Sequence, residues 1–443
     1  MEEGAYAAQW GALSSVREIK PSWKWPEGRI RRPLTFDPMM IRFHPPKWPL
    51  HQHLYERISL WHLAVRKPLC RVFWVWEVPA LQSYHPLTRI AFLTLLRESQ
   101  PEKLATLRSL GFRLSEEVHL DGVITGLEGL TENLPAALEV VYRLWTEMPL
   151  TEGALQPIVE RLVQERRRAW AYPSFRATAY LKGRLWGRTY AIQSLLSPEE
   201  MRTLRAEELQ RFYEELLRKS LRHLIVVSPT VPRVLFQWIG WQGALSYRLP
   251  LDSPAWGWYT ETDEHAQQAS LRIAYPGLRR SHPWYAHFRL ALMHLGGYFG
   301  SRLMQEIREK GGYTYGIHAR AVEAWAGSYF LIESEIDKAR AAEATQKILD
   351  IVSAWAEKPF ENEQSLLQTR NYLLSRLSLE TPGEWASTLA HLLLHGYGPE
   401  WYIHQAGRLS QLELSDYERW IGYSLAKPVG GVMVGSPSPI FAA

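Results

Sequence analysis

Hydrophobic and polar positions follow the same succession twice along the chain. In residues 104–130 and again in residues 303–334, a helical pattern ends at a glycine and gives way to alternating apolar and polar residues, which predict strands. Amphipathic helices are predicted next, at residues 134–145 and 341–355. Each half of the chain therefore predicts a helix, strands, long helices and a closing strand.

Further positions repeat at an almost constant offset. Two predicted helices each begin near a proline and reach a glycine fourteen residues later, and two short apolar runs, LIVVSP at 224–229 and VMVGSP at 432–437, end in Ser-Pro. The corresponding prolines, glycines and apolar runs are separated by 209, 209 and 208 residues: Pro173 and Pro382, Gly187 and Gly396, Leu224 and Val432. Such regular self-similarity indicates a duplicated structural unit.

The repeat predicts an α+β fold made of two homologous halves, each an antiparallel-rich sheet packed by helices. Residues 50–228 form the first half and residues 262–443 the second. Residues 229–261, rich in Pro, Gly and Trp and without clear periodicity, are predicted to be a linker. Residues 1–49 are predicted to form an N-terminal extension, an arm or an extended wrap.

Composition places the chain among globular proteins with more than one core. It has 443 residues, of which 46% are hydrophobic and 22% charged. The net charge of +5 is spread among interleaved acids and bases, so no nucleic-acid partner is expected. Cys70, the sole cysteine, lies in an apolar stretch that predicts a buried, inert thiol.

No membrane span and no secretory leader are visible in the sequence. No apolar run approaches the ~20 residues that a membrane helix needs, and the first twenty residues lack an apolar core segment. A cytoplasmic protein is therefore expected, or a periplasmic one if a signal peptide has been removed.

One segment resembles a known family. The stretch LGGYFGSRLMQEIREKGGYTYGI at 295–317 is similar to the most recognisable C-terminal segment of pitrilysin-like (insulinase-like) zinc peptidases, which carries Leu-Gly-Gly, Ser-Arg-Leu, Arg-Glu and Tyr-Gly. The duplicated layout also resembles the paired homologous domains of that family, a LuxS/metalloenzyme-like α+β fold. The resemblance covers most of residues 50–443 and is weaker at 185–217.

The resemblance implies roles for two residues. In the family an Arg, and a Tyr seven residues later, face the zinc site, and they correspond here to Arg308 and Tyr315. Such donors would bind substrate and stabilise the negative charge that develops when zinc-bound water attacks a peptide carbonyl. A purely structural interpretation also stands: Arg308 would favour a helix C-terminus, and Tyr313 and Tyr315 would pack on a strand.

The metal site of the family is missing. Active members carry His-x-x-Glu-His on a helix of the first half, and this motif occurs nowhere in the chain. The corresponding helix, residues 86–99, places Ile90, Leu93 and Thr94 at the ligand and base positions. Glu165 is either the relic of the distal glutamate ligand or a surface carboxylate. No metal and no other cofactor are therefore expected in this chain.

One histidine pair offers an alternative. His391 and His395 are four residues apart, so they share a helix face as zinc ligands do. No Glu lies between them, and the first repeat has Lys182 and Trp186 at the corresponding positions. A metal at this pair would make the chain an independent hydrolase.

These features predict a non-catalytic subunit of a heterodimeric, bacterial processing-peptidase-like zinc peptidase, inactive alone. A homologous partner with His-x-x-Glu-His would supply zinc and base, and this chain Arg308 and Tyr315. A peptide substrate would be held by strand addition, with residues 326–336 as the candidate strand. The alternative is an assembly subunit of a larger complex with no peptidase role.

Overall fold

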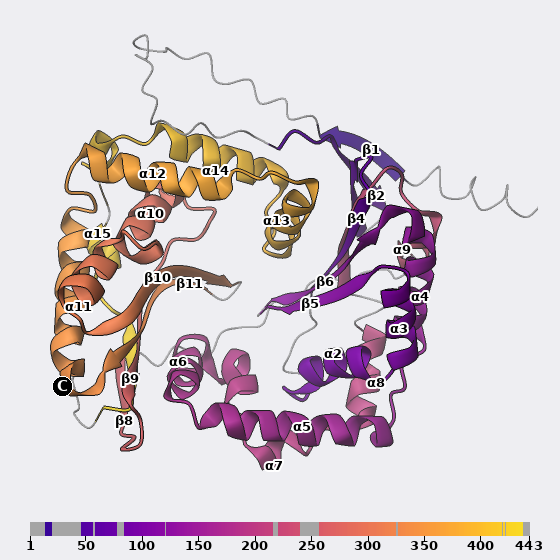
Figure 1. Cartoon of the computed structure of the whole chain (residues 1–443), viewed down its shortest axis with the longest axis horizontal. Coiled ribbons are helices and arrows are strands. Elements are labelled where there is room, and N and C mark those ends of the chain that lie inside the picture. The colour runs from indigo at the N-terminus through magenta and orange to yellow at the C-terminus, as the bar shows by residue number, and fades with distance from the viewer. Residues whose placement is uncertain are drawn as a thin grey trace, which may run out of the picture.

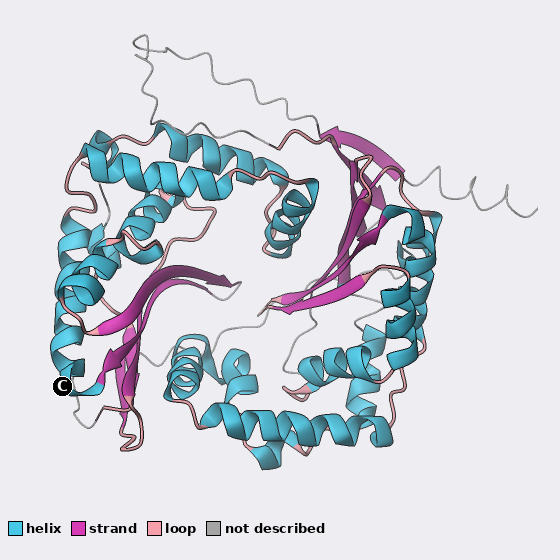
Figure 2. Cartoon of the chain, in the orientation of Figure 1, coloured by secondary structure: helices cyan, strands magenta, loops and turns pink. Residues whose placement is uncertain are grey.

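The computed structural model describes residues 14–19, 46–55, 58–77, 84–119, 121–215, 220–239, 257–324, 327–418, 420 and 422–436. Two sheets stand on opposite sides of the molecule, and helices complete the periphery (Figures 1 and 2). The hairpins β5–β6 and β10–β11 point from the sheets toward the middle of the molecule, and the helix α13 lies between the sheets there.

The two sheets repeat one topology. The first has the strand order β1-β2-β3-β7-β4-β6-β5 and the second the order β10-β11-β9-β12-β8. Five strands correspond, since β3-β7-β4-β6-β5 and β8-β12-β9-β11-β10 show the same sequence of one parallel and three antiparallel pairings. The strand bounds are β1 Ser14–Ile19, β2 Leu50–Tyr55, β3 Ile58–Ala64, β4 Leu69–Glu77, β5 Arg113–Val118, β6 Gly122–Leu130, β7 Leu221–Ser228, β8 Gly257–Glu261, β9 Gln268–Pro276, β10 Thr314–Ala324, β11 Gly327–Asp337 and β12 Gly430–Val434. The predicted fold class, two α+β repeats, is confirmed.

The helices repeat as well. Pro173 begins α6 and Pro382 begins α13, where a proline costs no hydrogen bond. Gly187 interrupts α6 and Gly396 follows the end of α13, with φ of 72° and 78°, which a residue with a side chain rarely adopts. The helix bounds are α2 Thr88–Glu98, α3 Pro101–Ser109, α4 Leu134–Thr146, α5 Glu152–Trp170, α6 Pro173–Leu195, α7 Pro198–Met201, α8 Ala206–Glu215, α9 Phe236–Ile239, α10 Tyr285–Leu292, α11 Ala341–Glu357, α12 Glu363–Leu377, α13 Pro382–Leu394, α14 Pro399–Gln411 and α15 Gly422–Leu425.

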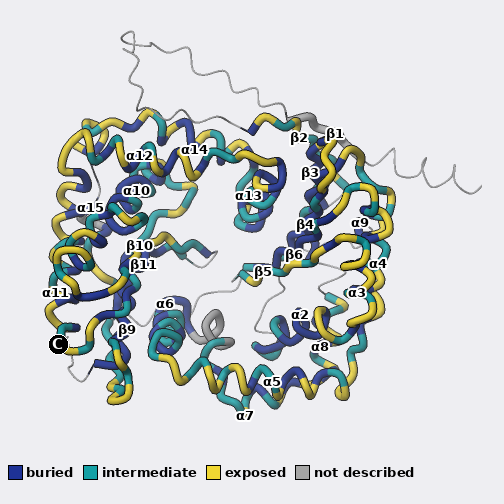
Figure 3. Tube along the Cα trace, in the orientation of Figure 1, coloured by how far each residue is buried: buried dark blue, intermediate teal, exposed yellow. Residues whose placement is uncertain are grey.

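The apolar run in β4 is continuous because both faces of the first sheet are covered. Trp74 and Trp76 point into one core, where the ring of Trp76 stacks on Trp145 of α4 at 4.8 Å. Phe73 and Val75 point into the core on the other face. Successive side chains of a strand alternate between faces, so only a strand buried on both faces reads as an unbroken apolar stretch. Figure 3 shows buried positions along these strands and exposed positions along α5 and α11.

Each half lends a helix to the sheet of the other half. Helix α13, from the second half, packs on β4 and β7 of the first sheet, whereas α6, from the first half, packs on β9 and β12 of the second. In Figure 1, α13 accordingly lies beside β4, and α6 beside β9 and β10. Burying a large apolar side chain is worth about 1.5–3 kcal/mol. Side chains such as Leu389 of α13 and Leu181 of α6 therefore make the stability of each half depend on the other.

Three segments differ from the sequence-based picture. The stretch predicted as a linker contains β8, which pairs with β12, and α9, whose Trp238 is buried against the first core. Within the predicted N-terminal extension, β1 pairs with β2. The strand predicted to accept a peptide, β11, is wrong for that role, because β10 and β9 already occupy both of its edges. Among the described strands, β1 and β5 are the outer strands of the first sheet, and β10 and β8 are those of the second.

None of the described helices combines the length and the hydropathy that crossing a bilayer requires. Cys70 is a free, buried thiol, and desolvation raises its pKa to about 11.

Candidate functional site

Arg308 and Tyr315 lie on either side of a glycine-terminated helix end. Helix α10 continues into η5, Met293–Gly297, and after a short loop the chain forms η6, Met304–Lys310; η5 and η6 are wound as π-helices. Gly312 has φ of 61°, and its N–H donates to the carbonyl of Arg308 at 3.0 Å. The N–H of Tyr313 donates to the carbonyl of Ile307 at 3.0 Å. These bonds end η6 and direct the chain into β10.

The Leu-Gly-Gly sequence brings η5 against β10. A Cβ atom on Gly296 would lie 2.6 Å from the Cβ of Ala319 and 2.7 Å from its backbone nitrogen. Only glycine allows this approach of backbone to backbone. The helical segment and the strand are therefore held in direct contact.

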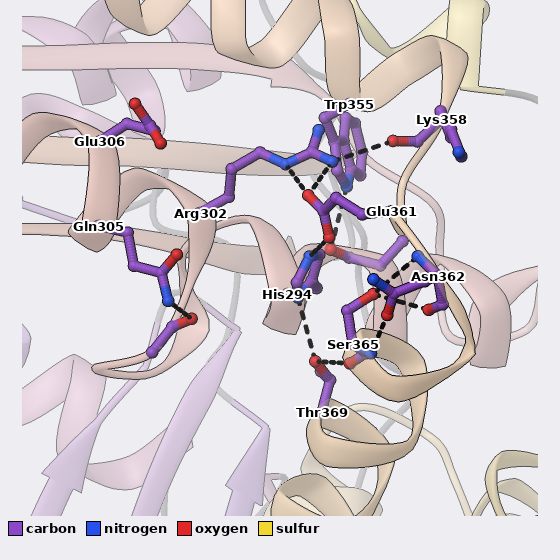
Figure 4. Close-up of polar contacts among 12 residues, drawn as sticks. His294, Arg302, Gln305, Glu306, Trp355, Lys358, Glu361, Asn362, Ser365 and Thr369 are labelled. Carbon is purple, nitrogen blue, oxygen red and sulfur yellow. Dashed lines mark hydrogen bonds and ion pairs between the residues drawn. The ribbon is translucent and has the colours of Figure 1, made fainter.

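The arginine of the Ser-Arg-Leu sequence has a structural role, shown in Figure 4. Arg302 Nε donates to Glu361 Oε1 at 2.8 Å, and His294 Nε2 lies 2.9 Å from Glu361 Oε2. His294 Nδ1 in turn lies 3.1 Å from the hydroxyl of Thr369 on α12. Desolvation alone would raise the pKa of Glu361, but hydrogen bonding and attraction from Arg302 lower it to about 2. This cluster ties η5 and the start of η6 to α12.

Arg308 keeps its hydrogen-bonding capacity. Its side chain is half-buried, and its guanidinium lies over the ring of Phe299, 4.8 Å from the centroid. The guanidinium forms no hydrogen bond and no ion pair with another described residue. Phe299 is itself 62% exposed, which is unusual for a large apolar side chain. The guanidinium is therefore able to donate hydrogen bonds to a carbonyl or carboxylate group of a ligand.

Tyr313 and Tyr315 have opposite environments. Tyr313 is 5% exposed; its hydroxyl donates to Glu343 Oε1 at 2.5 Å, and the guanidinium of Arg340 lies 3.9 Å from its ring centroid. Tyr315 is 89% exposed, and no interaction joins its hydroxyl to another described residue. The packing explanation therefore accounts for Tyr313 but not for Tyr315.

A bulge fixes the backbone at Tyr315. The pairing of β10 with β11 shifts register between Thr314 and Ile317. The N–H of Gly316 donates to the hydroxyl of Thr314 at 3.1 Å, and the hydroxyl of Ser334 donates to the carbonyl of Gly316 at 3.0 Å. Bulges of this kind redirect a side chain away from the ladder. Tyr315 is thus presented from a backbone held by side-chain hydrogen bonds.

A cavity of about 520 Å³ lies farther along β10, between this strand and α10, α12, α13 and α14. Its lining includes four arginines and no carboxylate, together with apolar walls such as Leu292 and Trp401. Two of these arginines are paired within the protein, Arg280 with Glu323 and Arg320 with Glu333. The cavity does not include Arg308 or Tyr315 in its lining.

The side chains of the other two cavity arginines, Arg289 and Arg376, form no hydrogen bond or ion pair with another described residue. The Arg289 residue is partly exposed. The protein around its guanidinium still desolvates that group, and this lowers the pKa of Arg289. An uncompensated guanidinium in a partly apolar cavity is a ready partner for a carboxylate.

The positions that correspond to the metal motif cannot bind a metal. On α2, Leu93 and Thr94 are buried and Ile90 is half-buried, and all three have side chains without ligand character. Glu165, on α5, is exposed and lies 3.6 Å from Arg161, one helical turn away. Its environment is that of a surface carboxylate.

His391 on α13 and His395 just after its end contact Glu117 at the end of β5 and Asp121 in the β5–β6 turn, which the sequence did not predict. His391 Nε2 lies 2.8 Å from Glu117 Oε2, whereas His395 Nδ1 lies 3.8 Å from Asp121. Desolvation and the charge of Arg280 lower the pKa of His395 to about 3. Each histidine therefore faces an acid of the first half.

Comparison with known proteins agrees with the fold. Residues 203–370 match the family described as "Peptidase M16 inactive domain". No curated protein matches the sequence. The matching region, residues 203–370, is therefore similar to an inactive domain of the M16 (pitrilysin-like) peptidases.

Solved structures share the architecture over nearly the whole chain. A peptidase M16 inactive domain from Pseudomonas fluorescens superimposes with a TM-score of 0.77 at 17% identity, covering 86% of this chain and 96% of that one. A protease from Helicobacter pylori gives 0.74 at 14% identity, covering 88% and 100%. The periplasmic protease PqqL from Escherichia coli gives 0.69 at 13% identity, covering 95% of this chain and 49% of that chain. At these identities the likeness establishes a common fold.

Proposed function

We propose that the chain is the non-catalytic subunit of a heterodimeric zinc peptidase. A homologous partner that carries His-x-x-Glu-His supplies the zinc and the general base, and this chain supplies Arg308 and Tyr315 to the same site. The observation that carries the proposal is the state of these two side chains: Tyr315 is 89% exposed, and Arg308 has no hydrogen-bond or ion-pair partner among the described residues. Both project from a backbone that the π-helices, the glycine pair and the bulge hold in place.

The chemistry divides between the chains according to their residues. Zinc polarises the scissile carbonyl and activates water, which this chain cannot do at Ile90, Leu93 and Thr94. The guanidinium of Arg308 and the phenol of Tyr315 are donors for the oxygen on which charge accumulates. A donor that is already positioned loses little conformational freedom when the transition state forms, so it favours that state over the ground state.

An extended peptide is the substrate class that these surfaces suit. No described strand pairs with the outer edge of β10, so a peptide strand could pair there next to Tyr315. The cavity with Arg289 and Arg376 then offers a place for a carboxylate, either the peptide terminus or an acidic side chain. We place the complex in the cytoplasm, or in the periplasm if a leader precedes the chain in its precursor.

Reconstitution tests the proposal. Each chain, and a 1:1 mixture of this chain with a homologue that carries His-x-x-Glu-His, is assayed against a set of quenched fluorescent peptides. Cleavage only in the mixture is expected. A stable complex that cleaves no better than the zinc-bearing chain alone would instead favour the assembly role. In that role Tyr315 contacts the partner chain and takes no part in catalysis.

A further inference from the structure

Three potential metal ligands from the two halves of the chain meet where the β5–β6 turn contacts α13. They are Glu117 at the end of β5, His119 in the turn, and His391 on α13, and one ligand atom from each lies within 4.8 Å of the other two. Glu117 and His391 are separated by 274 residues, so their meeting depends on α13 packing against the first sheet.

The hydrogen bond of His391 fixes which nitrogen faces the cluster. Its Nδ1 lies 2.7 Å from the carbonyl of Ser387, and a carbonyl can only accept, so Nδ1 carries the proton. When the imidazole is neutral, the lone pair of Nε2 points at Glu117 Oε2, 2.8 Å away. Two acceptors at this distance repel each other unless a proton or a cation lies between them. A backbone-bound Nδ1–H is also the usual outer contact of a metal-binding histidine.

His119 brings a second ring nitrogen to the same place. Its Nε2 is buried from solvent, has no hydrogen bond to another described residue and lies 3.6 Å from Glu117 Oε2. The backbone around it is fixed, because Arg89 of α2 donates to the His119 carbonyl at 2.7 Å and the His119 N–H donates to Gly122 at 2.9 Å. One cation would satisfy Nε2 of His119, Nε2 of His391 and the Glu117 carboxylate together.

We propose that Glu117, His119 and His391 bind a zinc-like divalent cation that joins the two halves of the chain. Two imidazoles and one carboxylate suit Zn²⁺ and related transition metals, whereas Ca²⁺ and Mg²⁺ prefer oxygen ligands. Ligand atoms of a tetrahedral zinc site lie about 3.3 Å apart, and the observed 2.8 and 3.6 Å bracket that value. Exposed surface on Glu117 and His391 leaves room for water as the fourth ligand.

The surroundings fit a cation that joins the halves rather than a hydrolytic centre. The positive Arg280 and Arg320, which share a cavity with His391, are already paired with Glu323 and Glu333. None of the three ligands is on α2, so this site is distinct from the missing peptidase motif. It includes His391 but not His395, which the sequence spacing had suggested as the second ligand. The cation would cross-link the first half's hairpin to the second half's helix and so favour the folded chain over the unfolded one.

Metal titration of the isolated chain tests the site without any peptidase assay. Chain stripped with a chelator is titrated with ZnCl₂ by calorimetry, and the melting temperature is measured with and without zinc. We expect one Zn²⁺ per chain and a higher melting temperature that excess chelator reverses. E117Q and H391Q should each weaken binding by about 100-fold, while H404Q, on the exposed face of α14, should bind as the wild type does.

Cobalt gives a second readout. Co²⁺ bound by the wild type should show the visible absorption of a four-coordinate nitrogen–oxygen site, and H119Q should lack it. Substoichiometric zinc binding by the wild type, or equal affinities for H391Q and H404Q, would overturn the proposal. Because E117Q keeps the shape of the side chain, it answers the question even if a histidine variant does not fold.

Discussion

Tyr313 and Tyr315 are two residues apart at the start of one strand, yet the first is 5% exposed and the second 89%. The hydroxyl of Tyr313 is bonded to Glu343, whereas that of Tyr315 is available. Two tyrosines in nearly the same sequence environment thus have different roles: one anchors the strand to α11, and the other is presented outward.

Arg308→Ala should lower kcat/KM of the reconstituted peptidase by ~10²-fold, because it removes a charge-assisted donor. Arg308→Lys should recover only part of that loss, since an ammonium group cannot replace the planar two-pronged geometry of a guanidinium. The measurement is steady-state kinetics on the 1:1 mixture. Lys310→Ala, at the end of the same helical segment and exposed, is the control and should change little; equal effects at both positions would mean that general charge, not Arg308, matters.

Arg289→Gln should weaken the binding of peptides that end in a free carboxylate. An N-acetylated dipeptide with an apolar last residue should lose ~10-fold or more in affinity, whereas its C-terminal amide should bind weakly to both proteins. Calorimetry on the isolated chain measures this. Arg108→Gln, an exposed charge-matched change on α3, is the control. If acid and amide bind the wild type equally, the cavity does not recognise a carboxylate.

Glu361→Gln should destabilise the chain in a pH-dependent way. The folded pKa of Glu361, about 2, is below its ordinary value of 4.5, so its contribution is present above pH 4.5 and is lost as pH falls toward 2. Because the side chain is about half exposed, the loss at neutral pH should be only about 1 kcal/mol. Denaturant unfolding at pH 6, 4 and 3 should show the gap between variant and wild type closing; a constant gap would refute the assignment.

Leu389→Ala and Leu181→Ala should each destabilise the whole chain by about 2–5 kcal/mol, because each removes a buried side chain from an exchanged helix. Leu69→Ala, at a position that is 56% exposed, should cost less than about 0.5 kcal/mol. Since each half covers the other's sheet, urea should produce one transition for every variant. Two separate transitions would show that the halves are stable independently.

The sequence predicted the repeat because its markers are local. Pro173 and Pro382 start helices, and Gly187 and Gly396 adopt a backbone conformation that few residues tolerate, so both signals survive in one sequence. The exchange of α6 and α13 could not be predicted, since periodicity shows which face of a helix is apolar but not which sheet that face meets.

Other features could not be predicted from the sequence for similar reasons. β8 has only five residues and a parallel partner, β12, that lies far away in sequence, so its short run gave no periodicity. The order of strands within a sheet leaves no local mark, which is why β11 was wrongly predicted to be available to a peptide. The meeting of His391 with Glu117 and His119 depends on the exchanged helix, and therefore became visible only in three dimensions.

The substitution Tyr315→Phe tests the central proposal most directly, because it removes one exposed hydroxyl and no packing. In the reconstituted mixture, kcat should fall by ~10²-fold, the range for losing one oxyanion donor, with complex formation unchanged. Tyr172→Phe, at another exposed tyrosine, should behave as the wild type does. An active mixture in which Tyr315→Phe retains the wild-type kcat would contradict the shared site.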